Sequence, residues 1–167
     1  MTKEINRYYL EIYSADELKE KKLLSDDFYV SHVDPPNFQL NRFFYKNVGK
    51  NHRWIDRLTW NDLKWIDYVQ NAKVDTYVLK KIDDVLGYFE LIHHKNTCEV
   101  EIAYLGLLEE YLNKNLGSLL LSSAIKKSFL KNPRRVWVHT CTLDHRNALN
   151  NYLSRGMKVF KREKIYI

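Results

Sequence analysis

The segment of residues 113–117, with the sequence NKNLG, has the residue types that phosphate binding requires. It lies where the pattern predicts the start of a helix, and a helix start presents free backbone N–H groups and the positive end of the helix dipole. Gly117 would let a ligand approach the backbone, while Asn113 and Asn115 tolerate left-handed backbone angles and can partly replace glycine. Lys114 adds a mobile positive charge. The segment therefore predicts a pyrophosphate cradle, with an ordinary turn before a core helix as the alternative.

A strand before the cradle and a buried helix after it must hold these groups in place. Residues 98–105 alternate in polarity, so Val100, Ile102 and Tyr104 are expected on one face of a strand that Gly106 ends. The following residues carry an apolar stripe at helical spacing, made of Leu116, Leu119, Leu120 and Ala124. The unit is therefore a strand, a short loop and a core helix.

The rest of the chain predicts one domain, residues 1–167, of α/β or α+β class. We expect strands at 6–13, 28–33, 76–82, 86–93, 98–105 and 135–141, and helices at 37–48, 62–70, 115–130 and 144–155. Residues 157–167 are expected to close the domain as a strand or a hairpin. Short turns at residues 83–84 and 95–96 imply an antiparallel meander, and Asp144 is the expected cap of the last helix.

Composition argues against several classes of protein. Of the 167 residues 45% are hydrophobic and 14% aromatic, which argues against disorder. The sequence has neither an apolar run of membrane-spanning length nor a signal-peptide core, so we expect a cytoplasmic protein without a membrane partner. Two cysteines are too few for a disulfide framework. The net charge of +6 comes from scattered Lys and Arg, so a solvated surface is favoured over a nucleic-acid partner.

Several segments, spaced along the chain in the family's order, resemble GNAT-type N-acetyltransferases. The family motif in the cradle is Gln or Arg, two residues, Gly, one residue, then Gly or Ala; Leu112 and Asn115 depart from it and Gly117 keeps it. Residues 144–157, DHRNALNNYLSRGM, are similar to the family's closing helix, with Ala, then Tyr, then Gly before a strand. Residues 53–60, 100–108 and 139–145 look like one bacterial subgroup of this family.

The resemblance implies a GNAT-like fold, with a mixed, mostly antiparallel sheet and helices on both sides. Two parallel central strands, the one that ends at Leu105 and the one at 135–141, would splay apart, and acetyl-CoA would lie in the gap between them as cosubstrate. The backbone amide near Leu107 would polarise the thioester carbonyl. The residues implied in cofactor binding are Leu105, Gly106, Leu107, Leu112, Asn113, Lys114, Asn115, Leu116, Gly117, Ser118 and His145.

The same resemblance suggests two catalytic residues. Glu101 is the candidate base, acting through water on a protonated amine, although it could simply belong to the polar face of its strand; Glu90 is a second candidate. Tyr152 is the candidate acid for the departing thiolate. Its alternative is a core aromatic, because it shares an apolar stripe with Leu149 and Leu153.

The early helices would form the acceptor side. Trp54 could stack on a cationic acceptor that Asp56 holds, and Arg57 could bind a carboxylate. The alternative is that the aromatic residues are core and that Asp56 and Arg57 form a structural ion pair. His139, Cys141 and His145 have metal-ligating side chains, but no fourth ligand is evident nearby, so no metal is expected.

These features predict an N-acetyltransferase that moves the acetyl group of acetyl-CoA to a primary amine of a small molecule or protein. A non-catalytic acetyl-CoA-binding or sensor module of the same fold is the first alternative, and a basic nucleic-acid-binding domain is the second. The final strand is a possible pairing edge for a homodimer.

Overall fold

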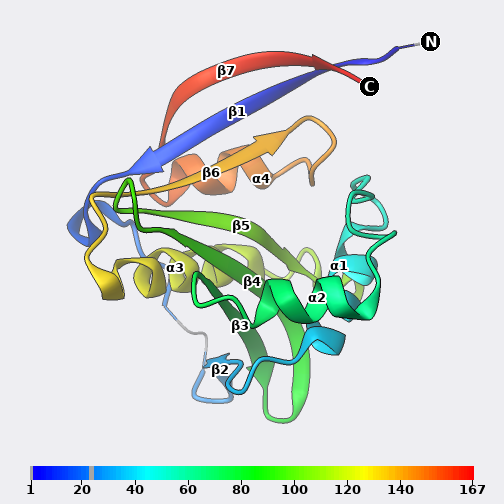
Figure 1. Cartoon of the computed structure of the whole chain (residues 1–167). Helices are drawn as coiled ribbons and strands as arrows, with labels where there is room; N and C mark the ends of the chain where they lie inside the picture. Colours follow the sequence, from blue (N-terminus) through cyan, green and yellow to red (C-terminus); the bar gives the residue numbers. More distant parts are fainter. Residues whose placement is uncertain (1, 23–24) are drawn as a thin grey trace.

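The computed structural model describes residues 2–22 and 25–167, in which seven strands form one mixed sheet (Figure 1). The strand order is β2-β3-β4-β5-β6-β1-β7. The strands are β1 (Glu4–Ile12), β2 (Phe28–His32), β3 (Val74–Lys81), β4 (Asp84–His94), β5 (Glu99–Leu107), β6 (Arg135–Cys141) and β7 (Lys158–Tyr166). The helices are α1 (Phe38–Gly49), α2 (Asp62–Val69), α3 (Leu116–Ser128) and α4 (Ala148–Ser154).

Helices cover the sheet on both faces (Figure 1). The larger hydrophobic core joins α3 to one face of the central strands and includes Leu120, Ile102 and Val138. The smaller core joins α1 to the other face, where Phe44 stacks on Tyr88 with ring centroids 4.8 Å apart. The stripe expected for the central helix lies in the larger core, and so do Val100 and Ile102 of the alternating segment. The expectation that Tyr104 shares their face was wrong, because a bulge at Ala103 reverses the alternation and Tyr104 packs in the smaller core.

The antiparallel meander is confirmed, because β3 pairs with β4 and β4 with β5 in antiparallel register. The last segment is a single strand, β7, antiparallel to β1. The expected start of the last helix was wrong. Asp144 does not cap it, because its carboxylate accepts hydrogen bonds from Thr140 Oγ1 at 2.5 Å and from the backbone N–H of Cys141 at 3.1 Å, which forms a turn; α4 begins three residues later, after Asn147.

The central splay is confirmed at the junction of β5 and β6. These parallel strands pair only from Glu99 to Glu101, although β5 runs on to Leu107, through Gly106 where its end was expected. A bulge at Ala103 separates the β4 partners of Ile102 and Tyr104 and bends β5 at this point. Beyond Glu101 the strands diverge, and the edge of β5 is left without a neighbouring strand on the β6 side.

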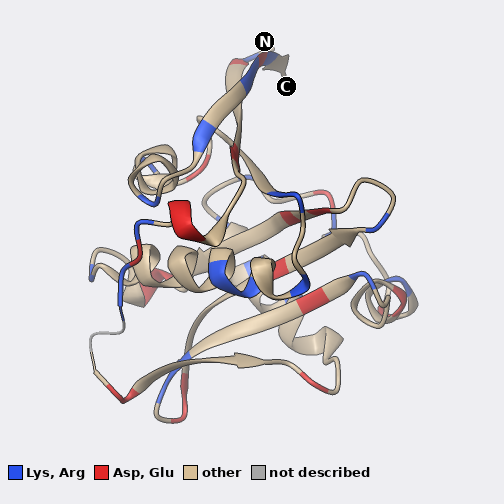
Figure 2. Cartoon of the chain, turned by 90° about the vertical axis from the view of Figure 1, so that its left-hand side faces the viewer, with Lys and Arg blue, Asp and Glu red and all other residues tan. Residues whose placement is uncertain are grey.

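Charged residues are distributed over many elements rather than gathered on one. On the face shown in Figure 2, Lys and Arg lie on several separate segments, with Asp and Glu between them. In the part of the chain that the structure describes, no helix has the length and apolar character needed to cross a membrane.

Candidate active site

A cavity of about 900 Å³ opens where β5 and β6 separate. Its walls come from the second half of β5, the end of β6, the start of α3, α4 and the loop between α1 and α2. The site residues expected from the sequence lie along this cavity, except Lys114 and the second candidate base, Glu90. The splay therefore brings together residues that are up to 98 positions apart, from Trp54 to Tyr152.

The cradle at the start of α3 has the backbone that its asparagines suggested. Asn113 and Asn115 both have φ of 60°, in the left-handed region. Asn115 occupies the cap position of α3 but makes no side-chain capping bond, so its side chain does not occupy the first N–H groups of the helix. A helix start in this state suits an anionic ligand.

Gly117 keeps the cradle open. A Cβ placed on it would meet only Asn151 Nδ2 at 3.8 Å and Leu107 Cδ1 at 4.0 Å, which are ordinary contacts. Packing inside the protein therefore does not require glycine here, whereas close approach of a ligand does. Gly106 differs, since a Cβ there would collide with Val48 of α1; its glycine is explained by the packing of α1 on β5.

Lys114 lies outside this cradle. It is exposed, and its Nζ is 5.8 Å from the centre of the Tyr111 ring, over which it lies. Leu112, which stands where the family has Arg or Gln, lines the cavity and packs against the larger core. An aliphatic side chain cannot bond a phosphate, so at this end the backbone supplies the polar contacts.

The free edge of β5 supplies donors along the cavity. The N–H of Leu108 donates to the carbonyl of Leu86 on β4 at 2.8 Å. Because N–H groups alternate in direction along a strand, those of Leu105 and Leu107 point away from β4, toward the side that β6 has left. A carbonyl lying along this edge could accept a hydrogen bond from them.

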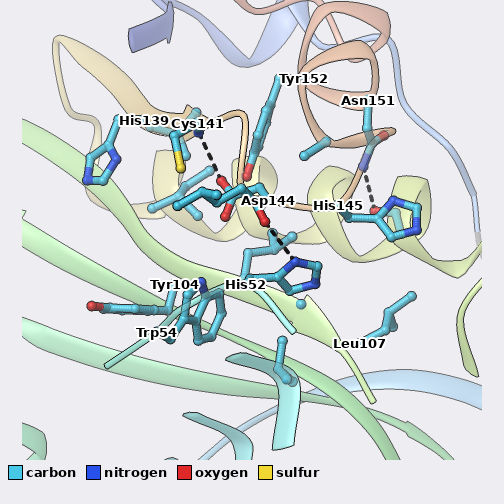
Figure 3. A pocket seen from close by; sticks show the side chains of 18 of the residues that line it. His52, Trp54, Tyr104, Leu107, His139, Cys141, Asp144, His145, Asn151 and Tyr152 are labelled. Atoms are coloured by element: carbon cyan, nitrogen blue, oxygen red, sulfur yellow. Dashed lines mark hydrogen bonds between the residues drawn. The ribbon is translucent and has the colours of Figure 1, made fainter. Parts of the chain in front are cut away.

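Tyr152 comes from α4 and ends in the cavity beside Asp144 (Figure 3). The residue is 7% exposed. Burial raises the pKa of its hydroxyl strongly, and the negative charge of Asp144 adds to the rise. The phenol therefore stays protonated at neutral pH, as a proton donor must.

Glu101 lines the cavity from β5, with 16% of its side chain exposed. Its Oε2 atom lies 3.0 Å from Nε2 of His94, whose ring stacks on Trp137. One carboxylate oxygen is thus already bonded. Glu99, its neighbour on this face, is bound by Arg135 at 3.0 Å and also by Arg134, so these two glutamates are not a simple solvated face.

Glu90 and Arg57 form a buried ion pair behind the cavity. Arg57 Nη1 lies 2.9 Å from Glu90 Oε2, and the two residues are 6% and 0% exposed. Tyr68 and Asn41 also donate to this carboxylate, at 2.8 Å each. Burial is the largest single influence on the pKa of Arg57 and acts to lower it, but the charge of Glu90 together with Tyr68 and Tyr104 outweighs burial, and the pKa is raised.

Aromatic rings complete the surroundings of Arg57. Its guanidinium lies 4.0 Å from the ring centre of Tyr68 and 4.2 Å from that of Tyr104. The alternative in which Asp56 and Arg57 form a structural ion pair was wrong, because Arg57 pairs with Glu90, 33 residues away in the chain. Glu90 is accordingly not a free base, and the Arg57 guanidinium is already engaged.

Trp54 and Asp56 lie in the α1–α2 loop that forms the acceptor wall. The Trp54 ring packs edge-on against Tyr104, with ring centroids 4.9 Å apart. One side of the ring therefore belongs to the core, which was the alternative to a role in acceptor binding. Asp56 is exposed and borders the cavity.

Three histidines lie at the cavity: His52, His139 and His145. From the sequence, none of them was given a catalytic role, and only His145 was implied in cofactor binding. His52 Nδ1 is 3.1 Å from the carbonyl of Leu143 and connects the α1–α2 loop to the β6–α4 loop (Figure 3). His145 accepts the N–H of Asn147 on its Nδ1, and burial lowers its pKa. His139 lines the cavity from β6. Its alternation with Cys141 was the signal in the sequence, which we interpreted only as possible metal ligands.

Across residues 2–22 and 25–167, no group of three or more His, Cys, Asp or Glu side chains has the arrangement of a metal site.

The sequence profile of the Acetyltransferase (GNAT) family matches residues 22–157. The chain belongs to the GNAT family of acetyltransferases. The splay and the cradle at the start of α3 are thus parts of a GNAT fold.

Solved structures of GNAT proteins share this fold. A GCN5-related N-acetyltransferase from Sphaerobacter thermophilus aligns with a TM-score of 0.73 at 12% identity, covering 99% of this chain and 53% of that one. Another from Kribbella flavida gives 0.67 at 13% identity, covering 96% and 56%. A spermidine N-acetyltransferase from Vibrio cholerae, in complex with CoA and spermine, gives 0.63 at 14% identity, covering 85% and 96%.

At these identities the likeness shows the fold alone. The chain spans little more than half the length of the first two proteins. A search of curated proteins gave no match to this sequence.

Proposed function

We propose that this GNAT protein is an N-acetyltransferase that moves an acetyl group from acetyl-CoA to a primary amine of a small molecule or protein by direct attack. One observation carries the proposal: a single cavity runs from the cradle at α3, along the free edge of β5, to the hydroxyl of Tyr152. Family membership and the neighbour solved with CoA support the choice of cosubstrate.

The chain's own residues fit this cosubstrate. The backbone N–H groups of residues 113–118 would bind the pyrophosphate, with Gly117 leaving it room. The pantetheine arm would lie along Leu105, Gly106 and Leu107, within reach of His145. Acetyl-CoA supplies an activated thioester, and the Leu107 N–H would stabilise the negative charge on its carbonyl oxygen. Holding the two reactants side by side supplies much of the acceleration.

Two protons must move during the reaction. Tyr152, protonated at neutral pH and directed into the cavity, would give its proton to the departing thiolate. Glu101 is the base expected from the sequence, acting through water, and it lines the same cavity. A cytoplasmic location and a homodimer through β7, which forms one edge of the sheet, remain predictions.

The acceptor is proposed to be cationic. Asp56 presents an exposed carboxylate at the cavity, with Trp54 beside it, and Arg57 is neutralised by Glu90. The neighbour solved with spermine makes polyamines the first amines to screen.

A binding measurement tests the proposal. We expect micromolar one-to-one binding of acetyl-CoA and of free CoA by calorimetry, followed by thiol release when polyamines, aminoglycosides and amino acids are screened. Binding without release for any amine would favour the non-catalytic acetyl-CoA-binding module, which the replacement of the family's Arg or Gln by Leu112 also supports. Absence of binding at millimolar ligand would contradict both functions.

Replacing Gly117 by alanine should weaken acetyl-CoA binding by about tenfold, because the new methyl group occupies the space where the phosphate approaches. The melting temperature should change little, since the methyl group meets only ordinary contacts at 3.8 and 4.0 Å. Calorimetry and thermal unfolding measure the two effects, and Ser123→Ala on the same helix is the control. Equal affinity for the ligand in the Gly117 variant would contradict the cradle.

Replacing Asp56 by asparagine should raise the KM for a cationic amine about tenfold and leave kcat nearly unchanged, because an attraction present before and during the reaction is lost. Steady-state kinetics with the amine found in the screen measures this change, with Asp62→Asn, on the exposed start of α2, as control. Identical kinetics would remove Asp56 from the acceptor site.

A further inference from the structure

His139 is placed at the cavity by the alternation of β6. Val136, Val138 and Thr140 point into the protein and are at most 2% exposed. His139 and Cys141 lie on the opposite face of β6, beside the gap between β5 and β6, and both line the cavity. The ring of Tyr9 on β1 packs against the imidazole, with centroids 5.6 Å apart, and fixes its position.

Three of the other proton acceptors at the cavity already have hydrogen-bond partners. One oxygen of Glu101 is taken by His94, and Asp144 accepts two hydrogen bonds from Thr140 and Cys141. His145 accepts the N–H of Asn147. By contrast, neither ring nitrogen of His139 has a hydrogen-bond partner among the described residues.

The surroundings of His139 keep it neutral. The His139 side chain is exposed to solvent, but the protein atoms packed around its ring reduce its hydration and lower its pKa, and the positive charge of Arg7 acts in the same direction. Negative groups from the other neighbouring elements oppose this shift without reversing it. They are Glu101 on β5, Asp144 in the β6–α4 loop and Glu163 on β7. The imidazole therefore has a free lone pair at neutral pH.

We propose that His139, rather than Glu101, is the general base that takes the proton of the acceptor ammonium group. The proposal rests on the proposed function and names a catalytic residue for it. Glu101, bound to His94 on the neighbouring strand, then stabilises the imidazolium that forms. A neutral acceptor with a free lone pair at the splay is what an ammonium substrate requires, because only the deprotonated amine can attack.

A ring nitrogen of His139 takes one proton from the ammonium, and the freed lone pair forms a C–N bond to the thioester carbonyl carbon. The C–S bond breaks, and the sulfur takes the hydroxyl proton of Tyr152. The second proton lost by the nitrogen returns to Tyr152 through water, and His139 releases its own to solvent. The net products are the amide, free thiol and one proton.

Two amines of the same size test the assignment. Ethylamine is protonated at neutral pH and needs a base, whereas methoxyamine has an oxygen in place of one methylene group and is already unprotonated. We expect His139→Gln to lower kcat/KM for ethylamine about 100-fold. The same variant should acetylate methoxyamine within about twofold of the wild-type rate, because no proton has to be removed before attack.

The pH profile gives a second readout. In the wild-type protein, kcat/KM for ethylamine should fall only in acid, at a pH below the ordinary pKa of a histidine, because the pKa of His139 is lowered and the ring is protonated only there. In His139→Gln this fall should disappear. Thiol release in the presence of acetyl-CoA, corrected for the rate without protein, measures both amines.

Glu101→Gln is assayed in parallel. A loss confined to ethylamine in Glu101→Gln but not in His139→Gln would overturn the proposal and return the base to Glu101. An equal loss with both amines in His139→Gln would show a merely structural role and would also overturn it. If the wild-type protein binds acetyl-CoA but accelerates neither amine nor any amine of the screen, the proposed function itself fails, before any variant is compared.

Discussion

Replacing Glu90 by alanine is expected to lower the free energy of unfolding by about 3–5 kcal/mol, the range for breaking a buried ion pair. Glu90 is fully buried and bonds Arg57, Tyr68 and Asn41 together. Its loss leaves a guanidinium that is 6% exposed without a counter-charge. Urea unfolding followed by tryptophan fluorescence measures the effect, because Trp60 and Trp65 both lie near the Arg57 guanidinium.

Two further variants separate charge from packing. Glu109 makes an ion pair with Lys50 at 2.7 Å, but both side chains are at least half exposed, so Glu109→Ala should unfold at the wild-type urea concentration. Replacing Glu90 and Arg57 together by methionine should recover much of the stability lost in Glu90→Ala, because no buried charge then remains. A double variant less stable than the single one would contradict the argument.

The same ion pair has a consequence for the acceptor wall. The backbone N–H of Arg57 donates to the hydroxyl of Tyr45 on α1 at 3.1 Å, so the side chain and backbone of this residue both anchor the α1–α2 loop. Trp54 and Asp56 lie in that loop. A Glu90 variant that still folds should therefore show a raised KM for the amine with unchanged affinity for acetyl-CoA.

Replacing Tyr152 by phenylalanine is expected to lower kcat by about 100- to 1000-fold, the usual contribution of a positioned proton donor. The hydroxyl ends in the cavity and carries its proton at neutral pH, as an ordinary tyrosine does, while its raised pKa means that it gives the proton only to a strong base such as a thiolate. The aromatic ring, which packs in the larger core, is retained. Steady-state thiol release with an amine acetylated by the wild-type protein measures the change.

Binding and stability distinguish this role from a core aromatic. The Tyr152→Phe variant should bind acetyl-CoA with unchanged affinity and unfold near the wild-type temperature, because only the hydroxyl is removed. Tyr13→Phe is the matched control, since its exposed hydroxyl bonds Glu11 away from the cavity. Unchanged turnover in Tyr152→Phe would mean that the thiolate leaves unprotonated or takes its proton from water.

Local features of this fold were predictable from the sequence. Alternation in residues 98–105 and the apolar stripe of α3 specify the strand and the helix, because each period matches its own backbone geometry. Asn113 and Asn115 indicated left-handed backbone angles, since asparagine adopts them at little cost, and both residues have φ of 60°. The GNAT fold followed from such short-range patterns in a particular order.

Pairings between distant segments were decided only by the tertiary structure. Arg57 has Asp56 as its neighbour in the chain, yet its ion-pair partner is Glu90, because that carboxylate is buried beside it and also accepts hydrogen bonds from Tyr68 and Asn41. Asp144 was predicted to cap a helix, but in the folded loop its carboxylate accepts a hydrogen bond from Thr140. His139 became a candidate base for the same reason: the sequence determines that β6 alternates, but only packing decides which side chains are left without partners.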